Sequence, residues 1–474
     1  MPQPQQENPN RPEIAGFGSG GPLAVLSIRP GEAAVTLLST LTIFTFFLGY
    51  GMIRPLRDAM GVERGFDDIP RLITATMVVS LAVSPLVAWT VRRIGKTPDG
   101  RRRVMGLVFR FFAVNLLLFA LAKWLTPETQ RFRVGYAFYV WASVFNLTCV
   151  GAFWGLMADL HPRERSLRIY GVIAFGATLG LIGGGAAAKG LAEARVSPVV
   201  FFLILAALLE VAARFGALAI RKNPERERAG RGDAAAPAPR HDPDSETNQS
   251  HGTGTVSDPL PRSSPGPLSG IRAVLASPYL LAVCGYMLIY TVTSTFFYLA
   301  QQRIVLAAGE DTAARTGMNA TIDLWANGAT LLVQLLLTGR IMRWIGQGGA
   351  LAATPIVTLG GLAWLGQSPA LSALIPAVVA RKSVHYAVDR PGREALYTVI
   401  PPEQKYTAKS FIDTFVYRGG DVLGAWVETA MKSTNTPLVA LAAPLCIVGA
   451  GLGVWLGGRG NTAEENGGHE RLEK

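Results

Sequence analysis

Several ionisable residues occur in one stretch of the chain, 371–388, that is otherwise apolar enough to span a membrane. Charged side chains are costly inside a bilayer, so they face the protein interior or a water-filled cavity by default. Arg381 and Lys382 lie about ten residues into this stretch, which places them about 15 Å deep, near the bilayer midplane. Helical spacing puts most of the charged residues on one face. The residues are Arg381, Lys382, His385, Asp389, Arg393 and Glu394.

Two interpretations of this stripe remain open. Because it carries more positive than negative charge, it favours an anion-binding wall of a cavity. The alternative is a ladder of ion pairs that locks the helix to a neighbour, although such a ladder should balance its charges. His385 is the only histidine in an apolar stretch, and we assign it no proton relay.

A second basic element ends the apolar stretch 33–53. Arg54 and Arg57 flank Pro55, and Asp58 follows directly. Proline disrupts the helical hydrogen-bond ladder, and freed backbone groups beside two arginines would suit a phosphate or a carboxylate. The alternative is that both arginines only anchor the helix at the membrane interface.

Other charges occur as opposite-sign neighbours that we interpret as ion pairs. Such pairs could hold helices together or open and re-form during a conformational cycle. Asp323 receives no role, because it lies close enough to the expected start of its helix at 320 to be hydrated. The paired charges are Asp413, Arg418, Asp421 and Glu428 within 411–429, and Glu210 and Arg214 within 199–220.

A polar aromatic stripe follows one face of the stretch 279–299. Tyr286, Tyr290 and Ser294 recur every four residues, and Tyr298 continues the series. Tyr290 or Tyr298 could stack on a base or sugar ring, while hydrogen bonding between helices is the alternative.

The elements that position these residues are membrane-spanning helices. The chain has 474 residues, of which 49% are hydrophobic and 16% charged, and it contains repeated apolar stretches of about 20 residues, the length that crosses a bilayer. This profile excludes a soluble protein and predicts an all-α membrane protein with twelve spans in two six-helix bundles. The spans are 33–53, 72–91, 104–121, 136–157, 172–191, 199–220, 279–299, 320–337, 350–365, 371–388, 411–429 and 438–456.

The remaining segments are polar. We expect a disordered tail 1–32, a bundle 33–220, a disordered linker 221–276, a second bundle 277–456 and a tail 457–474. The Arg and Lys bias of the short loops predicts that both termini and the linker are cytoplasmic. The richness in Arg, Ala and Gly suggests a bacterial source, and hence the inner membrane.

Several function classes are disfavoured. The net charge of +12 lies mainly in the spans and their short loops, so nucleic acid is not an expected partner. The three cysteines lack metal-ligand spacing, and nucleotide-binding and catalytic motifs do not occur in a suitable context. We therefore expect no enzyme, metal or cofactor, but a monomer that takes a small anionic substrate within a lipid bilayer.

The stretch 381–424 resembles a segment of the nucleotide (ATP/ADP) translocase family of plastids and intracellular bacteria. Arg54-x-x-Arg57-Asp58 is similar to a second element of that family, and 171–180 to its glycine-rich fifth span. The matching positions in the first segment are Lys382, Ser383, Tyr386, Asp389, Arg393-Glu394, Tyr397, Ile400-Pro401, Lys405, Lys409 and Ile412-Asp413.

The resemblance implies a twelve-helix fold like that of the major facilitator superfamily. It also implies roles in nucleotide transport for Arg57 and Arg393, which stand where the family has lysines. The expected function is a secondary transporter of an anionic, phosphate-bearing metabolite, with ATP/ADP exchange as the specific candidate, working by alternating access. The candidate substrate-binding residues are Arg54, Arg57, Asp58, Tyr290, Tyr298, Arg381, Lys382, His385, Arg393 and Glu394; the candidate gating residues are Asp413, Arg418, Asp421, Glu210 and Arg214.

Two alternatives stand beside this expectation. One is a permease or exporter of another organic anion, with proton coupling as an option. The other is a membrane scaffold or sensor that transports nothing and signals through the linker 221–276.

Overall fold

The computed structural model describes residues 32–472 except 96, 162, 224–268, 398–399, 401–406, 410 and 433–436. Within this part the secondary structure is helical, without strands, and nine helices are long and apolar enough to cross a membrane. The three other expected spans coincide with α11, with α13 and the π-helical turn η2, and with η3 and α16. The prediction of an all-α, multi-pass membrane protein is confirmed.

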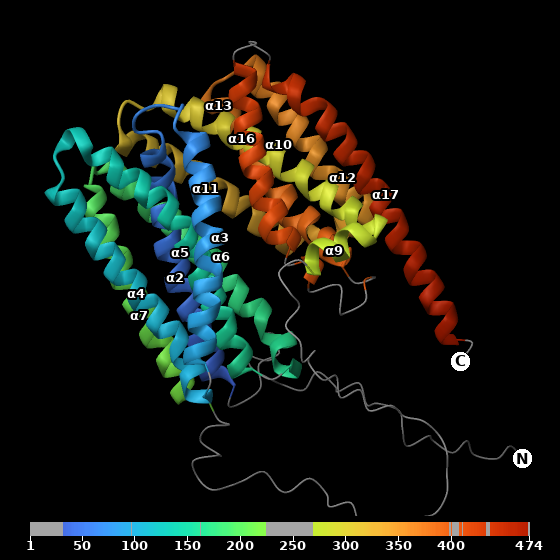
Figure 1. Ribbon diagram of the computed structural model, residues 1–474, viewed down its shortest axis with the longest axis horizontal. Coiled ribbons are helices and arrows are strands. Elements are labelled where there is room, and N and C mark those ends of the chain that lie inside the picture. Colours follow the sequence, from blue (N-terminus) through green and yellow to red (C-terminus); the bar gives the residue numbers. More distant parts are fainter. Residues whose placement is uncertain are drawn as a thin grey trace, which may run out of the picture.

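Six long helices form the first half of the molecule, coloured blue to green in Figure 1. Each one contains an expected span and extends beyond it, because a helix continues past the apolar core of the bilayer into its polar boundary. They are α2 (Ala33–Gly61), α3 (Ile69–Ile94), α4 (Pro98–Leu125), α5 (Arg131–Leu160), α6 (Arg163–Glu193) and α7 (Pro198–Arg221), with a short 3-10 turn at Glu128–Gln130.

The second half is coloured yellow to red in Figure 1 and has more interruptions. Two of its spans contain π-helical turns, η2 and η3, which insert an extra residue and rotate the side chains that follow. The elements are α9 (Ser269–Ala276), α10 (Pro278–Ala308), α11 (Thr312–Leu336), α12 (Thr338–Gln367), α13 (Leu371–Val384), η2 (His385–Asp389), α14 (Arg390–Ala395), η3 (Ile412–Val416), α16 (Tyr417–Lys432) and α17 (Leu438–Leu472).

The structure differs from the expected boundaries in several places. Residues 269–276 of the expected linker form helix α9, and α17 continues through most of the expected tail to Leu472. The first span does not end at 53, because α2 remains helical through the buried Pro55 to Gly61. The expected disorder at 1–31 and 224–268 lies outside the described residues.

Helices α2 and α6 approach closely along a seam of glycines. A β-carbon at Gly180 would lie 2.4 Å from the carbonyl oxygen of Phe44, and one at Gly184 would lie 2.2 Å from that of Leu48. Only glycine permits such contact between helix backbones. The sequence predicts this seam from the repeat Gly176, Gly180, Gly184, and the structure confirms it.

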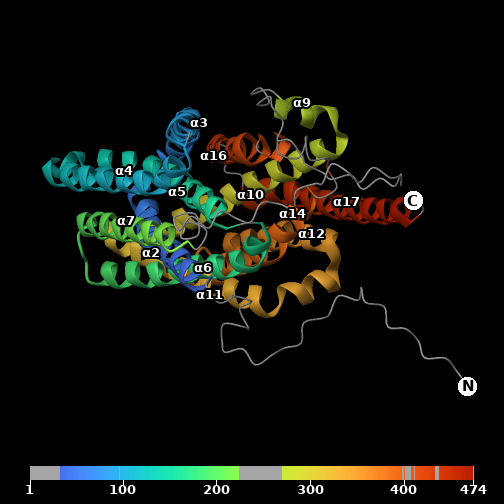
Figure 2. The ribbon, with the colours of Figure 1, turned by 90° about the horizontal axis from the view of Figure 1, so that it is seen from below.

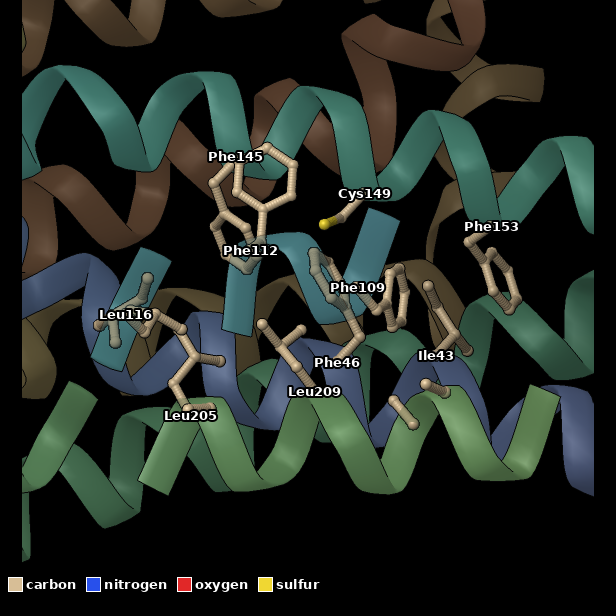
Figure 3. Close-up of a cluster of buried hydrophobic side chains, with 14 of the residues drawn as sticks. Ile43, Phe46, Phe109, Phe112, Leu116, Phe145, Cys149, Phe153, Leu205 and Leu209 are labelled. Atoms are coloured by element: carbon tan, nitrogen blue, oxygen red, sulfur yellow. The ribbon is translucent and has the colours of Figure 1, made fainter. Parts of the chain in front are cut away.

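Aromatic side chains fill the interior of the first bundle, as Figure 3 shows for Phe46, Phe109 and Phe145. The rings of Phe46 and Phe109 stack with their centroids 5.5 Å apart. In a bilayer, where lipid tails are as apolar as these side chains, such packing provides van der Waals contact rather than a hydrophobic driving force. The bundle therefore gives α2 a well-packed support for its charged end.

The two halves meet at the end of the molecule that carries the connection between α2 and α3, which we call the closed end. There Lys432 Nζ lies 2.8 Å from Asp67 Oδ1, and Trp426 Nε1 donates to Thr74 Oγ1 over 2.9 Å. Figure 2 shows the first-half helices α4 and α7 and the second-half helices α9 and α17 on opposite sides of the molecule, with α6 and α11 between them. The closed end thus joins α16 of the second half to α3 and to the α2–α3 connection of the first.

Candidate functional site

One carboxylate joins the two bundles near the centre of the molecule. Asp323 of α11 lies 2.6 Å from Lys382 Nζ of α13 and 3.6 Å from Arg54 Nε of α2. Its residue is only 7% exposed. We call this arrangement the Asp323 bridge, since it connects the first bundle to two helices of the second.

A second polar contact crosses between the bundles one turn further along α2. Arg57 Nη2 lies 2.5 Å from Asp58 Oδ1, and the hydroxyl of Tyr298 donates to the same oxygen over 3.2 Å. The Tyr298 hydroxyl is also 3.2 Å from that of Tyr139, whose ring lies under the Arg57 guanidinium. Tyr298, expected as a ring contact for a base, thus also holds Asp58 by its hydroxyl.

A polar cavity of about 210 Å³ adjoins this contact. Ligand pockets for drug-sized molecules are typically about 300–1,000 Å³, so the cavity admits a phosphoryl group or a small anion but not a whole nucleotide in this conformation. Its lining comes from both bundles. The residues are Arg57, Ile73, Thr76, Tyr139, Ser143, Ser294, Thr295, Tyr298, Tyr417, Arg418 and Asp421.

A larger cavity of about 560 Å³ lies between α3, α4 and α5, with Thr414 of η3 on its edge. Its lining runs from Ser80 to Arg101 and Asp159, which lie at the end of the molecule opposite the closed end. This cavity belongs mainly to the first bundle and shares no lining residue with the polar cavity.

Two residues in the middle of the predicted stripe, His385 and Asp389, form hydrogen bonds inside the second bundle. Asp389, which has no exposed surface, accepts from Tyr286 over 2.5 Å and lies 2.8 Å from His385 Nδ1. His385 Nε2 is 2.9 Å from the Tyr290 hydroxyl, and the two rings stack. His385 and Asp389 therefore hold their helix to α10, as the second interpretation of the stripe expects, rather than lining a cavity. Tyr290 offers at most one open ring face.

Two arginines of the stripe differ from the others. Arg381 donates to the hydroxyls of Ser294 and Thr358. Arg393 contacts the sulfur of Met287 at 3.2 Å. Among the residues that the structure describes, neither arginine forms an ion pair with a carboxylate. Neither guanidinium is therefore neutralised by a direct ion pair, and Arg393 lies over the Tyr290 ring, 5.9 Å from its centroid.

The remaining predicted residues fall outside this centre or at its edge. Arg418 and Asp421 form the expected pair at 3.9 Å and line the polar cavity. Glu394 is exposed and pairs with Lys409, while Asp413 is exposed within η3. These positions make Glu394 the weakest member of the predicted substrate set.

Glu210 and Arg214 form the expected pair at 3.0 Å, but on the outer surface of the first bundle. Glu210 also binds Arg110 of α4, with Arg110 Nε and Glu210 Oε2 2.9 Å apart. The pair therefore joins α7 to α4 of the same bundle and does not connect the two bundles.

Asp323 is the residue of the candidate site that sequence reasoning missed. The expected start of its helix at 320 was wrong, because α11 begins at Thr312 and Asp323 lies about eleven residues inside it, about 16 Å from its start. The first turns of α11 are polar since they pack on other helices rather than on lipid. A helix start read from the Asp311 cap, whose side chain accepts from the backbone of Ala314, would have revealed the buried carboxylate.

One comparison with known proteins identifies a family. The sequence model of the Major Facilitator Superfamily matches residues 32–388 of this chain. No curated protein sequence matches the chain significantly.

Solved structures of transporters share the fold. A bacterial homologue of the human lysosomal transporter Spinster, in an inward-facing and unoccupied conformation, has a TM-score of 0.53 and 14% identity over 92% of this chain and 95% of its own. A mutant of the nucleoside transporter NupG has a TM-score of 0.52 and 12% identity over 90% and 99% of the two chains. An auto-inhibited peptide transporter of the POT family has a TM-score of 0.54 and 14% identity over 92% and 97%.

Proposed function

The chain belongs to the Major Facilitator Superfamily and is a membrane transporter, and from this premise we propose that its cargo is an anionic, phosphate-bearing metabolite. The observation that carries the proposal is the pair of arginines, Arg381 and Arg393, without a carboxylate partner among the described residues. A buried cation is costly unless it is paired. A substrate that brings its own negative charge would supply the missing partner.

The residue type favours an anion that presents two oxygens side by side, as a phosphate does, over a single point charge. A guanidinium presents several N–H donors in a rigid fork that matches two oxygens of a phosphate, whereas an ammonium acts as a point charge. Arg54 and Arg57 add two further guanidiniums on the opposite bundle. An anion held between the bundles would thus meet arginines from both sides.

Nucleotide exchange is the specific form of the proposal. It is supported by the resemblance of 381–424 to nucleotide translocases and by Tyr298, which lines the polar cavity. The similarity to a nucleoside transporter supports only the fold, because the identity is 12%. The cavity volume of about 210 Å³ requires the bundles to separate further before a whole nucleotide could enter.

A smaller organic anion is the second candidate, and the same cavity volume favours it. A phosphoryl or carboxylate group would fit beside Arg57 without rearrangement. The scaffold alternative, with signalling through 221–276, gains no support from these contacts.

The Asp323 bridge suggests how the anion would drive the conformational cycle. A substrate anion that binds Arg54 and Lys382 would compete with Asp323 for both, and so weaken a contact between the bundles. A ligand shifts a conformational equilibrium only by its differential affinity for the two states. If the anion displaces Asp323, it binds more tightly to the state in which the Asp323 bridge is open, which is such a differential affinity.

We also propose that both termini are cytoplasmic and that the protein resides in a bacterial inner membrane. In that orientation the closed end faces outward, and the cavity between α3, α4 and α5 opens toward the cytoplasm. The structure would then correspond to an inward-facing state.

Uptake into proteoliposomes tests the proposal. Vesicles preloaded with unlabelled nucleotide would receive radiolabelled ATP, ADP or inorganic phosphate, and sugar phosphates and carboxylates would compete. We expect uptake that needs the internal anion and that is lost in Arg393→Ala but kept in Arg92→Gln, which changes an exposed arginine at the end of α3. Competition only by carboxylates would favour the second candidate, and no uptake of any anion by folded protein would refute both.

A further inference from the structure

A basic groove lies on the outer surface of the first bundle, between α4 and α7. It encloses about 180 Å³ and is lined on one side by Arg102, Arg103 and Arg110 and on the other by small or apolar residues of α7. The floor is open at Gly106, where an added β-carbon would meet nothing closer than the Arg110 guanidinium, at 4.0 Å. This groove is remote from the Asp323 bridge and from the polar cavity.

The charges around the groove do not balance. Glu210 is shared by two arginines, since its carboxylate binds both Arg110, at 2.9 Å, and Arg214, at 3.0 Å. Within the described part of the chain, Arg102 and Arg103 form no ion pair. One carboxylate therefore stands against four guanidiniums.

The groove also faces lipid. Leu107, Phe111 and Val114 on the same helix are 49%, 62% and 54% exposed, as expected for a surface that contacts acyl chains. Arg102 and Arg110 are eight residues apart, so the arginines extend over about 12 Å from the start of α4 into the apolar zone. Arg110, the deepest of the three, is paired with Glu210, whereas Arg102 and Arg103 lie at the polar boundary of the span without a carboxylate partner among the described residues. Basic pockets of this kind between membrane helices suit anionic lipid headgroups.

We propose that this groove binds the headgroup of an anionic phospholipid. The lipid phosphate lies against Arg102, Arg103 and Arg110, and one acyl chain follows Leu107 and Phe111 along α4. The occupant is a lipid rather than a soluble phosphate, because the arginines continue directly into this exposed apolar face. Charge complementarity and the open space above Gly106 define the site together.

Thermal unfolding of the purified protein in a neutral detergent tests the proposal. Phosphatidylglycerol, phosphatidylcholine with the same acyl chains, and glycerol 1-phosphate are added separately. We expect phosphatidylglycerol to raise the melting temperature of the wild type by a few degrees, because a ligand that binds only the folded state stabilises it. The other two additives should not.

Two variants assign the effect to the groove. Arg102→Gln/Arg103→Gln/Arg110→Gln removes the charge while leaving Glu210 its partner Arg214, and Gly106→Leu fills the groove without changing any charge. Both should lose the response to phosphatidylglycerol. The control Arg92→Gln/Arg93→Gln, which removes two exposed arginines at the end of α3, should keep it.

Three results would overturn the proposal. Groove variants that respond as the wild type does would place the lipid elsewhere. An equal response to phosphatidylcholine would mean that headgroup charge is not recognised, and an equal response to glycerol 1-phosphate would identify a site for soluble phosphate. If the triple variant does not fold, Gly106→Leu alone decides between these outcomes.

Discussion

The chemistry of the centre depends on which cation each carboxylate neutralises. Asp323 is shared by Arg54 and Lys382, Asp58 serves Arg57, and Asp389 is held by Tyr286 and His385 rather than by an arginine. Arg381 and Arg393 are what remains when these pairs are formed. A surplus of positive charge therefore arises from the distribution of partners and not only from the number of arginines.

Asp323→Asn tests whether this carboxylate competes with the substrate. Without it, Arg54 and Lys382 would be available to the anion, so we expect KM for uptake to fall and turnover to slow. The free energy of unfolding of the variant should also fall by about 3–5 kcal/mol, because a buried ion pair loses one partner. Asp311→Asn, which alters an exposed carboxylate paired with Arg195, is the control. An unchanged or raised KM would contradict the competition.

Arg381 distinguishes fork-shaped from point-charge recognition. We expect Arg381→Gln to raise KM about tenfold or more, the loss that corresponds to one charged hydrogen bond. Arg381→Lys should raise it nearly as much for a phosphate substrate, because lysine keeps the charge but not the planar fork. Uptake kinetics of the two variants side by side provide the measurement; full activity of the lysine variant would show that only charge matters.

At the scale of elements, helix interruptions decide which side chains reach the centre. The π-helical turn η2 carries His385 to Asp389, and side chains after it are rotated from the positions of an uninterrupted helix. Arg381 lies before this turn and Arg393 after it, so the two arginines do not keep the relative directions that a regular helix would give them. Apolar periodicity alone contains no signal for such a turn.

The glycine seam on α6 makes a prediction about that helix. We expect Gly180→Ala to destabilise the protein by about 1–3 kcal/mol, since its β-carbon would lie 2.4 Å from the Phe44 carbonyl oxygen and force α2 and α6 apart. Gly190→Ala, on the same helix with nothing within 4 Å of its added carbon, should be neutral or stabilising. Melting temperatures of the two variants test this; equal values would mean that the seam can relax.

At the scale of the whole molecule, contacts at one end hold the two bundles together. Asp67 and Lys432 are paired there at 2.8 Å, and Lys432 holds the pKa of the Asp67 carboxyl below its ordinary value. The pair is therefore formed at neutral pH, and it is lost only as the pH falls through that lowered pKa. Alternating access requires this contact to separate in each cycle.

Crosslinking tests that requirement directly. In a background without Cys149, Cys284 and Cys446, Asp67→Cys/Lys432→Cys joined by a short reducible thiol crosslinker should lose uptake and recover it on reduction. Each single cysteine variant, treated in the same way, should stay active. Undiminished uptake in the crosslinked protein would mean that the closed end does not open.

Much of the fold follows from local properties of the chain. Apolar stretches and helical periodicity predict the membrane location and the helices, and the glycine repeat predicts a close-packing seam on α6, because these signals depend on neighbouring residues. That the partner is α2 comes from the structure. The start of α11 was missed, because the polar residues in its first turns, from Thr312 onward, pack against other helices and not against water.

The sequence by itself determined the membrane-spanning helices, the likeness to the Major Facilitator Superfamily fold and most of the charged residues near the centre, but not Asp323. Only the tertiary structure decided which of those charges are neutralised. Asp323 pairs with Lys382 across 59 residues of sequence, and Tyr286 binds Asp389 across 103. Such pairing depends on which helices become neighbours, because the strength of an ionic contact is set by distance and burial and not by separation along the chain.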